Sequence, residues 1–309
     1  MRPWFGVAPA CLLALGVLTA PAVRADDMLA PGCRSASSAI LGAEGWYAGA
    51  LPPPGLHLVD YNFLYHAHEM KGRRGGHVSD PPFTDFTATV YAQVIRPVYV
   101  SKHTILGANP AWHAVIPFIY KEMESDFFGE SKFGLGDVYV SPLLLGWHRP
   151  PWHWVAGLDV ICPTGRYDSR DVVTIGNNHW TFEPAVAVSY IGTGGFSAST
   201  KLMYDIHTED RRLDYKEGDQ FHLDYNLGYS WGGQRQWRAG LCGYYLTSMA
   251  EDKQDGRRLP GSEEKVFAIG PTVSYQWGRL NIEAKLQHEM HAKNRPEGTA
   301  GWLKLIYSF

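Results

Sequence analysis

Ionisable and amide side chains occupy every second position in several otherwise apolar runs of the sequence. His222, Asp224 and Asn226 alternate with leucine and tyrosine in FHLDYNLGYSW, and the run LNIEAKLQHEMH repeats this pattern. Such groups exchange hydrogen bonds, form ion pairs or hold a cation when they line one surface. The candidate lining residues are Asp60, Asn62, His66, His68, Glu183, Lys201, Asp205, His207, His222, Asp224, Asn226, Glu283, Lys285, Gln287 and Glu289.

Two uses of this polar set remain open at the level of sequence. A narrow barrel is filled by a polar, hydrogen-bonded interior, and the same side chains line a path for solutes in a channel. The two interpretations are compatible for the set as a whole, although a packing role is the simpler expectation for each residue.

Side chains that face each other across two neighbouring strands would indicate a more specific chemistry. If the connection between residues 208 and 221 is symmetric, His207 faces His222 and Asp205 faces Asp224. Opposed carboxylates repel each other unless a proton, Lys201 or a divalent cation lies between them. His66 and His68 share a face, as metal ligands on a strand do.

The run HEMH at residues 288–291 does not match the helical zinc motif, since a strand places its two histidines on opposite faces. No complete metal or cofactor motif is present, so we expect no cofactor and no resident metal.

These residues must be positioned by strands, because the apolar period is two almost throughout the chain after Gly55. Each run has about the length that a tilted membrane strand needs, roughly 9–11 residues or slightly more. The pattern predicts an all-β, antiparallel, up-and-down transmembrane barrel of about twelve strands. We expect strands near residues 56–69, 84–101, 111–121, 135–147, 153–163, 179–191, 196–208, 220–231, 237–249, 264–277, 279–291 and 299–309.

The connections alternate in length, which is a second and independent sign of an outer-membrane barrel. Short turns such as GTGG at residues 192–195 follow the even-numbered strands, and long polar loops follow the odd-numbered ones; only SKHTILGAN, after the second strand, is of middling length. The short turns are expected on the periplasmic side and the long loops outside. Aromatic residues that flank the short turns should form the inner interfacial girdle: Trp147, Trp154, Tyr190, Phe196, Trp231, Trp237 and Trp277.

The chain divides into three parts. Residues 1–25 carry Arg2, an apolar stretch and small residues before Asp26, which is the pattern of a secretory signal peptide. Residues 26–54 do not alternate and are read as a periplasmic or lumen-plugging segment. Residues 55–309 form the predicted barrel. A net charge of −3 does not indicate a protein that binds nucleic acid, because such proteins carry an excess of basic residues.

The last strand ends on a bare aromatic residue. Leu303, Leu305, Tyr307 and Phe309 share one face of the run GWLKLIYSF. Lipid offers no hydrogen bonds, so this strand must pair with the first to close the barrel. The ending resembles that of bacterial outer-membrane proteins, whose final aromatic is read by the barrel-assembly machinery. Tyr307 and Phe309 are the expected assembly signal.

Several stretches together resemble a known family. AGALPPPGLHLVDYNFLY, GLGDVYVSPLLLGWH and PTGRYDSRDVVTIGNNHWTFEPAVAVSY are similar to outer-membrane proteins named for the meta pathway of phenol degradation. The resemblance covers about residues 48–309. It implies relatedness to fatty-acid and toluene channels, and movement of hydrophobic or aromatic compounds into Gram-negative cells.

We therefore expect a passive outer-membrane channel for small hydrophobic or aromatic solutes, and not an enzyme. Its expected partners are the lipid bilayer, lipopolysaccharide, the barrel-assembly machinery and the solute. A structural or adhesive barrel is one alternative. A lipid hydrolase is another, for which His288 is the candidate base, although no serine in a recognisable motif accompanies it.

Overall fold

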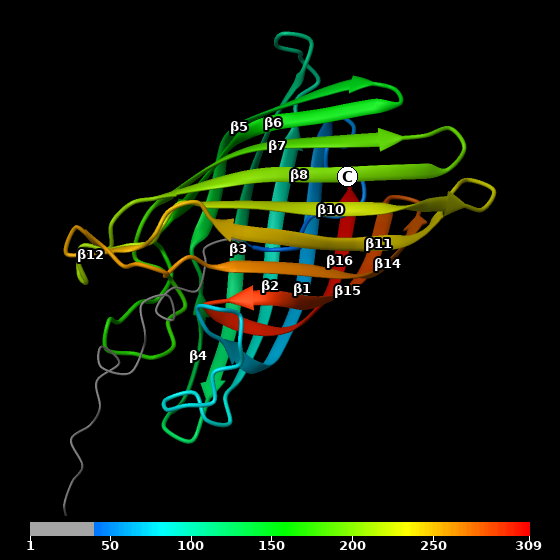
Figure 1. Ribbon diagram of the computed structural model, residues 1–309. Coiled ribbons are helices and arrows are strands. Elements are labelled where there is room, and N and C mark those ends of the chain that lie inside the picture. The colour runs from blue at the N-terminus through cyan, green and yellow to red at the C-terminus, as the bar shows by residue number, and fades with distance from the viewer. Residues whose placement is uncertain (1–39) are drawn as a thin grey trace, which may run out of the picture.

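A computed structural model of the chain describes residues 40–309, and its strands close into one antiparallel barrel (Figure 1). The predicted signal peptide and residues 26–39 lie outside the described residues. Within residues 40–309 no helix has the length and apolar character that a membrane span requires. Twelve long strands build the wall: β1 (Gly55–Lys71), β2 (Thr87–Val100), β3 (Asn109–Glu124), β5 (Val138–Arg149), β6 (Trp152–Cys162), β7 (Thr181–Ile191), β8 (Phe196–His207), β10 (Gln220–Trp231), β11 (Trp237–Ser248), β14 (Lys265–Trp277), β15 (Leu280–Lys293) and β16 (Arg295–Ser308).

The barrel closes between its first and last strands, as the sequence predicts. β1 pairs with β16 on one side and β2 on the other, and the remaining pairs follow chain order around the wall. Phe309 N donates a hydrogen bond of 3.1 Å to Leu56 O, just beyond the end of β16. Pairing therefore continues to the last residue, and backbone groups at the seam have partners.

Four short strands were not expected from the sequence. β4 (Gly129–Leu135) pairs with the second half of β3, while β5 pairs with its first half. β9 (Tyr215–Lys216), β12 (Lys253–Gln254) and β13 (Arg257–Arg258) form a separate three-stranded sheet. Both additions belong to the long connections, where short polar strands have too few alternating residues to be recognised.

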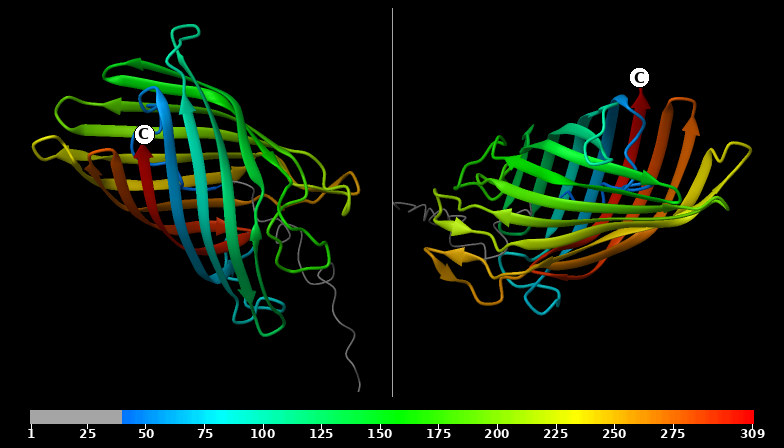
Figure 2. Two further views of the ribbon diagram at one scale, coloured as in Figure 1. Left: turned by 180° about the vertical axis from the view of Figure 1, so that it is seen from behind. Right: turned by 90° about the horizontal axis from the view of Figure 1, so that it is seen from above.

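The two ends of the barrel differ in character. The short turns lie at the same end as the C-terminus, and the long loops lie at the other (Figures 1 and 2). Aromatic pairs mark the short-turn end: Trp147 stacks on Trp154 at 6.2 Å between ring centroids, and Trp237 lies 4.4 Å from Tyr275. These rings occupy the place of an interfacial girdle.

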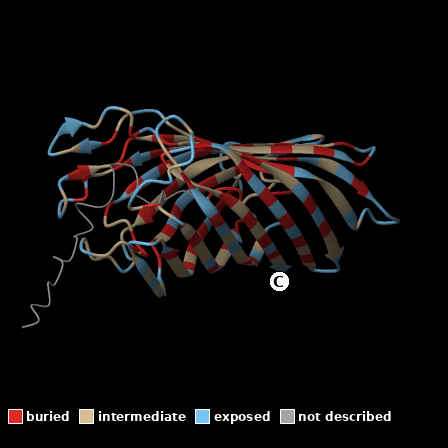
Figure 3. Ribbon diagram, turned by 60° about the horizontal axis from the view of Figure 1, so that its bottom comes forward, coloured by how far each residue is buried: buried red, intermediate tan, exposed pale blue. Residues whose placement is uncertain are grey.

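Burial alternates along the strands, so each strand has an inner and an outer face (Figure 3). In β10, His222, Asp224 and Asn226 are buried, whereas Leu227 and Tyr229 of the opposite series are exposed. The interior is polar over much of its length and the outer surface is apolar, which is the reverse of a soluble protein and the rule for a membrane barrel.

Candidate functional site

Three cavities follow one another along the inside of the barrel. At the long-loop end is a cavity of about 300 Å³, here called the apolar chamber, lined in part by Phe63, Phe83, Ile119, Met123, Ile175 and Trp302. At the short-turn end is a cavity of about 460 Å³, called the vestibule, lined in part by His57, Arg238, Arg279, Lys304 and Ser308. Between them lies a space of about 50 Å³, called the narrowing.

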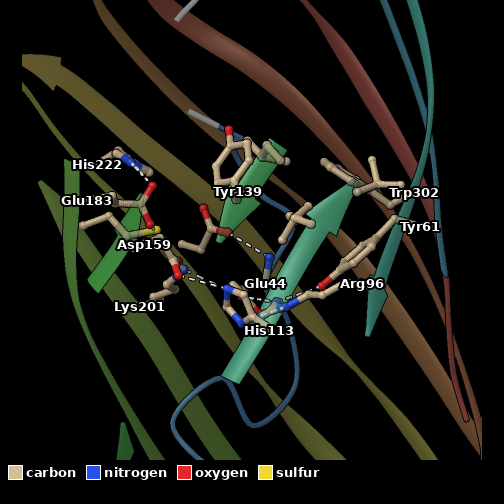
Figure 4. A pocket seen from close by; sticks show the side chains of 16 residues that line it. Glu44, Tyr61, Arg96, His113, Tyr139, Asp159, Glu183, Lys201, His222 and Trp302 are labelled. Atoms are coloured by element: carbon tan, nitrogen blue, oxygen red, sulfur yellow. Dashed lines mark hydrogen bonds and ion pairs between the residues drawn. The ribbon is translucent and has the colours of Figure 1, made fainter. Parts of the chain in front are cut away.

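Charged residues from several strands converge on the narrowing, and Glu44 of the N-terminal segment lies among them (Figure 4). Arg96 Nη1 of β2 donates a hydrogen bond of 2.9 Å to Glu44 Oε1. Lys201 Nζ of β8 and Lys304 Nζ of β16 each lie 3.9 Å from a Glu44 carboxylate oxygen. A single carboxylate from the N-terminal segment thus faces cations from three strands.

A chain of hydrogen bonds leads from Glu44 across the narrowing. The always-protonated Arg96 donates to His113 Nδ1 at 2.8 Å, so this nitrogen accepts and His113 Nε2 carries the hydrogen. His113 Nε2 therefore donates to Asp159 Oδ1 at 2.9 Å. Asp159 Oδ2 in turn lies 3.6 Å from Lys201 Nζ. The chain fixes the rotamers of all four wall residues.

Hydrogen bonds hold residues 40–54 inside the barrel. The Asp224 carboxylate accepts hydrogen bonds from the backbone N–H groups of Gly42 and Glu44, both at 2.9 Å. Lys285 Nζ donates to the carbonyl oxygens of Gly42, Ala43 and Glu44 at 2.6, 2.9 and 3.0 Å. Two charged wall residues therefore satisfy one turn of otherwise unpaired backbone in the lumen.

The same segment continues along the wall of β7 and β8. Tyr47 N donates to Ser199 Oγ at 3.2 Å, and Gly49 N donates to Ser189 Oγ at 2.8 Å. A Cβ atom at Gly49 would lie 2.6 Å from Ser189 N, which leaves no space for a larger residue. This close approach explains the glycine, since backbone meets backbone there.

Most of the predicted lining residues lie on the inner face. The structure places these side chains inside the barrel: Glu183, Lys201, Asp205, His207, His222, Asp224, Asn226, Glu283, Lys285, Gln287 and Glu289. Two of them also contact aromatic residues: Gln287 Oε1 accepts from Trp302 Nε1 at 3.0 Å, and Glu289 accepts from Tyr65 and Tyr244 at 2.7 and 2.8 Å.

The predicted orientation of β1 was wrong. Asp60, Asn62, His66 and His68 lie on its outer face, and Tyr61 and Phe63 of the other series point inward. The register explains this, because Tyr61 faces Lys304 and Phe63 faces Trp302, and directly opposed residues share a face. The inner face of β1 is aromatic where it borders the apolar chamber, so polarity misidentified the lumen side.

Three of the four outward residues of β1 form polar contacts with β2. Gln93 Nε2 donates to Asp60 Oδ1 at 3.4 Å, and Tyr91 OH donates to Asn62 Oδ1 at 3.3 Å. His66 Nδ1 lies 2.9 Å from Thr89 Oγ1. Neighbouring polar groups therefore satisfy one another on a wall that is otherwise mainly apolar.

The predicted facing pairs of β8 and β10 were also wrong. Asp205 faces Gln220, His222 faces Met203 and Asp224 faces Lys201. The turn is centred earlier in the chain than those pairs require, because Asp210 bridges to Tyr215 in the same register that pairs Asp205 with Gln220. Asp224 therefore meets a lysine and no second carboxylate across the strand pair.

Asp205 lies instead in a buried cluster with Glu183 and His222. His222 Nε2 is 3.3 Å from Asp205 Oδ2 and 3.6 Å from Glu183 Oε2. Lys201 Nζ lies 3.4 Å from Glu183 Oε1. A lysine and a histidine thus face two carboxylates on the inner wall between the narrowing and the long-loop end.

Several residues of the narrowing were not singled out from the sequence. Arg96, His113 and Asp159 are isolated polar residues on the inward positions of apolar strands, and that isolation was a usable signal. Glu44 had no such signal, since residues 40–54 follow no period. Its role depends on tertiary packing alone.

The candidate for a hydrolase base lies apart from the lumen. His288 is exposed on the outer face of β15, where its Nδ1 lies 3.0 Å from Thr299 Oγ1. Cys162 and Cys242 are free thiols, and Cys33 lies outside the described residues.

A closed antiparallel barrel with a polar interior, an apolar outer wall and a file of cavities defines a β-barrel of the outer-membrane channel class. The family model for the putative MetA-pathway of phenol degradation matches residues 70–305, and the chain belongs to this family. No curated protein sequence matches the chain.

One solved outer-membrane channel has the same fold. The chain is similar to an outer-membrane channel from Pseudomonas putida F1, with a TM-score of 0.76 and 15% sequence identity, covering 86% of this chain and 99% of that one. A Pseudomonas aeruginosa FadL homologue has a TM-score of 0.46 and 9% identity, covering 91% and 98% of the two chains. The TodX monoaromatic hydrocarbon channel, in a mutant form, has a TM-score of 0.43 and 7% identity, covering 84% and 91%.

Proposed function

We propose that the protein is a passive outer-membrane channel for small hydrophobic or aromatic solutes. The observation that carries this proposal is the apolar chamber of about 300 Å³ at the long-loop end. A dry apolar cavity of about 150 Å³ already holds a benzene ring. The chamber is therefore large enough for a single-ring solute. Its lining is mainly aromatic and aliphatic, which favours a solute that sheds water easily, although Lys121, Asp137, Glu264, Glu289 and Arg295 also line it.

Passage requires residues 40–54 to move. The narrowing, at about 50 Å³, is too small for a ring, and Glu44 lies within it. We therefore assign to residues 26–54 the role of a lumen plug that is released or displaced during transport. The inward charged residues of the wall hold this plug in place and give the solute path its polar middle section. Movement is downhill along the solute gradient, with no nucleotide involved.

The family description and the barrel class support this assignment. The matched family carries phenol degradation in its name, and the similar structure from Pseudomonas putida F1 is described as an outer-membrane channel. A purely structural barrel would have no need of an apolar chamber that leads to a plugged narrowing.

Uptake by cells tests the proposal. A strain that lacks this protein should accumulate radiolabelled phenol more slowly than the same strain with the gene restored, at low external concentration. Equal initial rates in the two strains, with the restored protein folded in the outer membrane, would contradict a channel function.

We also propose that the chain is exported with cleavage after Ala25 and is assembled into the outer membrane of a Gram-negative bacterium. The signal-like residues 1–25 and the closing strand that ends at Phe309 support this. Lipopolysaccharide and the barrel-assembly machinery are the expected partners. Intact-mass measurement of the membrane protein should give a chain that begins at Asp26; a chain that retains residues 1–25 would refute cleavage.

A further inference from the structure

Two histidines and a glutamate meet at the long-loop end of the barrel, outside the file of cavities described above. His179 precedes β7, His207 is the last residue of β8, and Glu217 lies between β9 and β10. One ligand atom from each residue lies within 4.8 Å of the other two. Their exposed fractions are 5%, 2% and 2%, so all three side chains are removed from solvent.

From this geometry we propose that His179, His207 and Glu217 form a binding site for a divalent metal of the zinc type. Imidazole nitrogen and carboxylate oxygen are the ligand atoms that Zn²⁺ takes when three protein groups hold it and a fourth position is left to water. Neither the sequence pattern nor the channel function assigns a role to this cluster.

The spacing of the ligand atoms suits a tetrahedral ion. His179 Nε2 lies 3.6 Å from Glu217 Oε2. Two ligands held about 2.0–2.2 Å from a tetrahedral metal lie roughly 3.3–3.6 Å apart, so this pair already has the required separation. The ring centroids of His179 and His207 are 5.1 Å apart.

His207 supplies the second line of evidence. Its Nδ1 lies 3.0 Å from Thr181 Oγ1, whereas its buried Nε2 has no hydrogen-bond partner. An unpaired polar atom in a buried site costs free energy, and metal coordination would remove that cost. The contact with Thr181 also sets the orientation of the ring, as the outer partners of metal-binding histidines do.

The other two ligands are oriented in the same way. His179 Nδ1 lies 3.4 Å from Trp180 O, and because a carbonyl only accepts, this contact directs the Nε2 lone pair toward the site. Gln220 Nε2 donates to Glu217 Oε1 at 2.8 Å, and Glu217 Oε2 is the oxygen that lies toward His179 Nε2. Each ligand therefore has a neighbour that helps to fix the orientation of its side chain.

A proton and a metal compete for this site. Burial alone would lower the pKa of His179, but the hydrogen bond and charge of Glu217 raise it above the ordinary value. Without metal the cluster is an ion pair beside an unpaired His207 nitrogen. A bound metal would join three segments at one point: the residues just before β7, the end of β8 and the connection between β9 and β10. This part of the long-loop end would then be held in one arrangement.

The test uses the full-length mature barrel, folded in detergent and stripped of metal with a chelator. Calorimetric titration with Zn²⁺ should show one equivalent bound. His207→Gln and Glu217→Gln should each weaken this binding at least about tenfold, while His103→Gln, at an exposed histidine far from the cluster, should not. Heat-modifiable mobility shows that each variant is folded, and His179→Gln replaces any variant that is not.

A spectroscopic measurement identifies the ligands independently of affinity. Co²⁺ added to the stripped barrel should give the visible absorption of a tetrahedral ion, and His207→Gln should abolish it. Absence of stoichiometric Zn²⁺ binding to the folded wild type would overturn the proposal. So would binding that persists in His207→Gln, or binding that is lost only in His222→Gln, which would assign it to the Glu183, Asp205 and His222 cluster.

Discussion

The Glu44 carboxylate and the Arg96 guanidinium meet in the middle of the lumen, 2.9 Å apart, and join the N-terminal segment to the barrel wall. They are separated by 52 positions in sequence and lie on two different elements. The ion pair is flanked by Lys201 and Lys304, so removal of the carboxylate leaves three cations without their shared partner. The strength of this contact decides whether the narrowing stays closed.

Glu44→Gln should open the narrowing more often. The variant loses the charge that Arg96, Lys201 and Lys304 share, which weakens plug anchoring by about 1–3 kcal/mol. We expect faster leakage of small polar solutes such as arabinose from liposomes that contain the variant. Glu263→Gln, at an exposed glutamate of the long-loop end, is the matched control and should leak like the wild type. Equal leakage by both variants would argue against Glu44 as an anchor.

Deletion of residues 26–54 should have a larger effect in the same direction. The deletion removes the backbone groups that Asp224 and Lys285 bind, and it joins the vestibule to the apolar chamber. Planar-bilayer recordings should show higher single-channel conductance than for the wild type. Unchanged conductance of a correctly folded variant would mean that this segment does not plug the lumen.

The orientation of β1 predicts opposite results for two substitutions of carboxylates. Asp60 lies on the outer face, so Asp60→Leu should be tolerated or should stabilise the barrel by about 1–2 kcal/mol. Glu283 lies on the inner face opposite Lys304, and Glu283→Leu should lower the temperature at which heat-modifiable mobility is lost. If Asp60→Leu lowered this temperature more than Glu283→Leu did, the side chain of Asp60 would have to face the lumen.

Loss of the terminal aromatic should impair assembly. Phe309 pairs with Leu56 through its backbone, and its ring lies 4.9 Å from that of Tyr307. Phe309→Asp should reduce folded protein in the outer membrane several-fold, because a charge replaces an apolar group at the closing seam. Phe127→Asp, at an exposed loop phenylalanine, is the control. Normal amounts of folded Phe309→Asp barrel would contradict the proposed assembly signal.

The strands could be predicted from the sequence because their evidence is repeated along the chain. Each run such as FHLDYNLGYSW has a period of two, and the alternation of short and long connections supports the same architecture. The closing pair of β1 and β16 also followed from the need to pair every backbone group.

The narrowing could not be predicted in the same way. The inward series of β1 is aromatic beside the apolar chamber, so the rule that polar residues face the lumen failed at Asp60 and Asn62. Glu44 lies in a segment without periodicity, and its partners on β2, β8 and β16 are brought together only by barrel closure. The turn between β8 and β10 is also centred earlier in the chain than expected, so Asp205 and Asp224 do not face each other.

Reconstitution of the purified barrel in liposomes tests the channel function most directly. The initial rate of phenol entry down its gradient, without ATP, should exceed that of empty liposomes several-fold and should rise with the amount of folded protein. Entry indistinguishable from that of empty liposomes, with heat-modifiable mobility confirming the fold, would contradict the channel and favour a structural barrel.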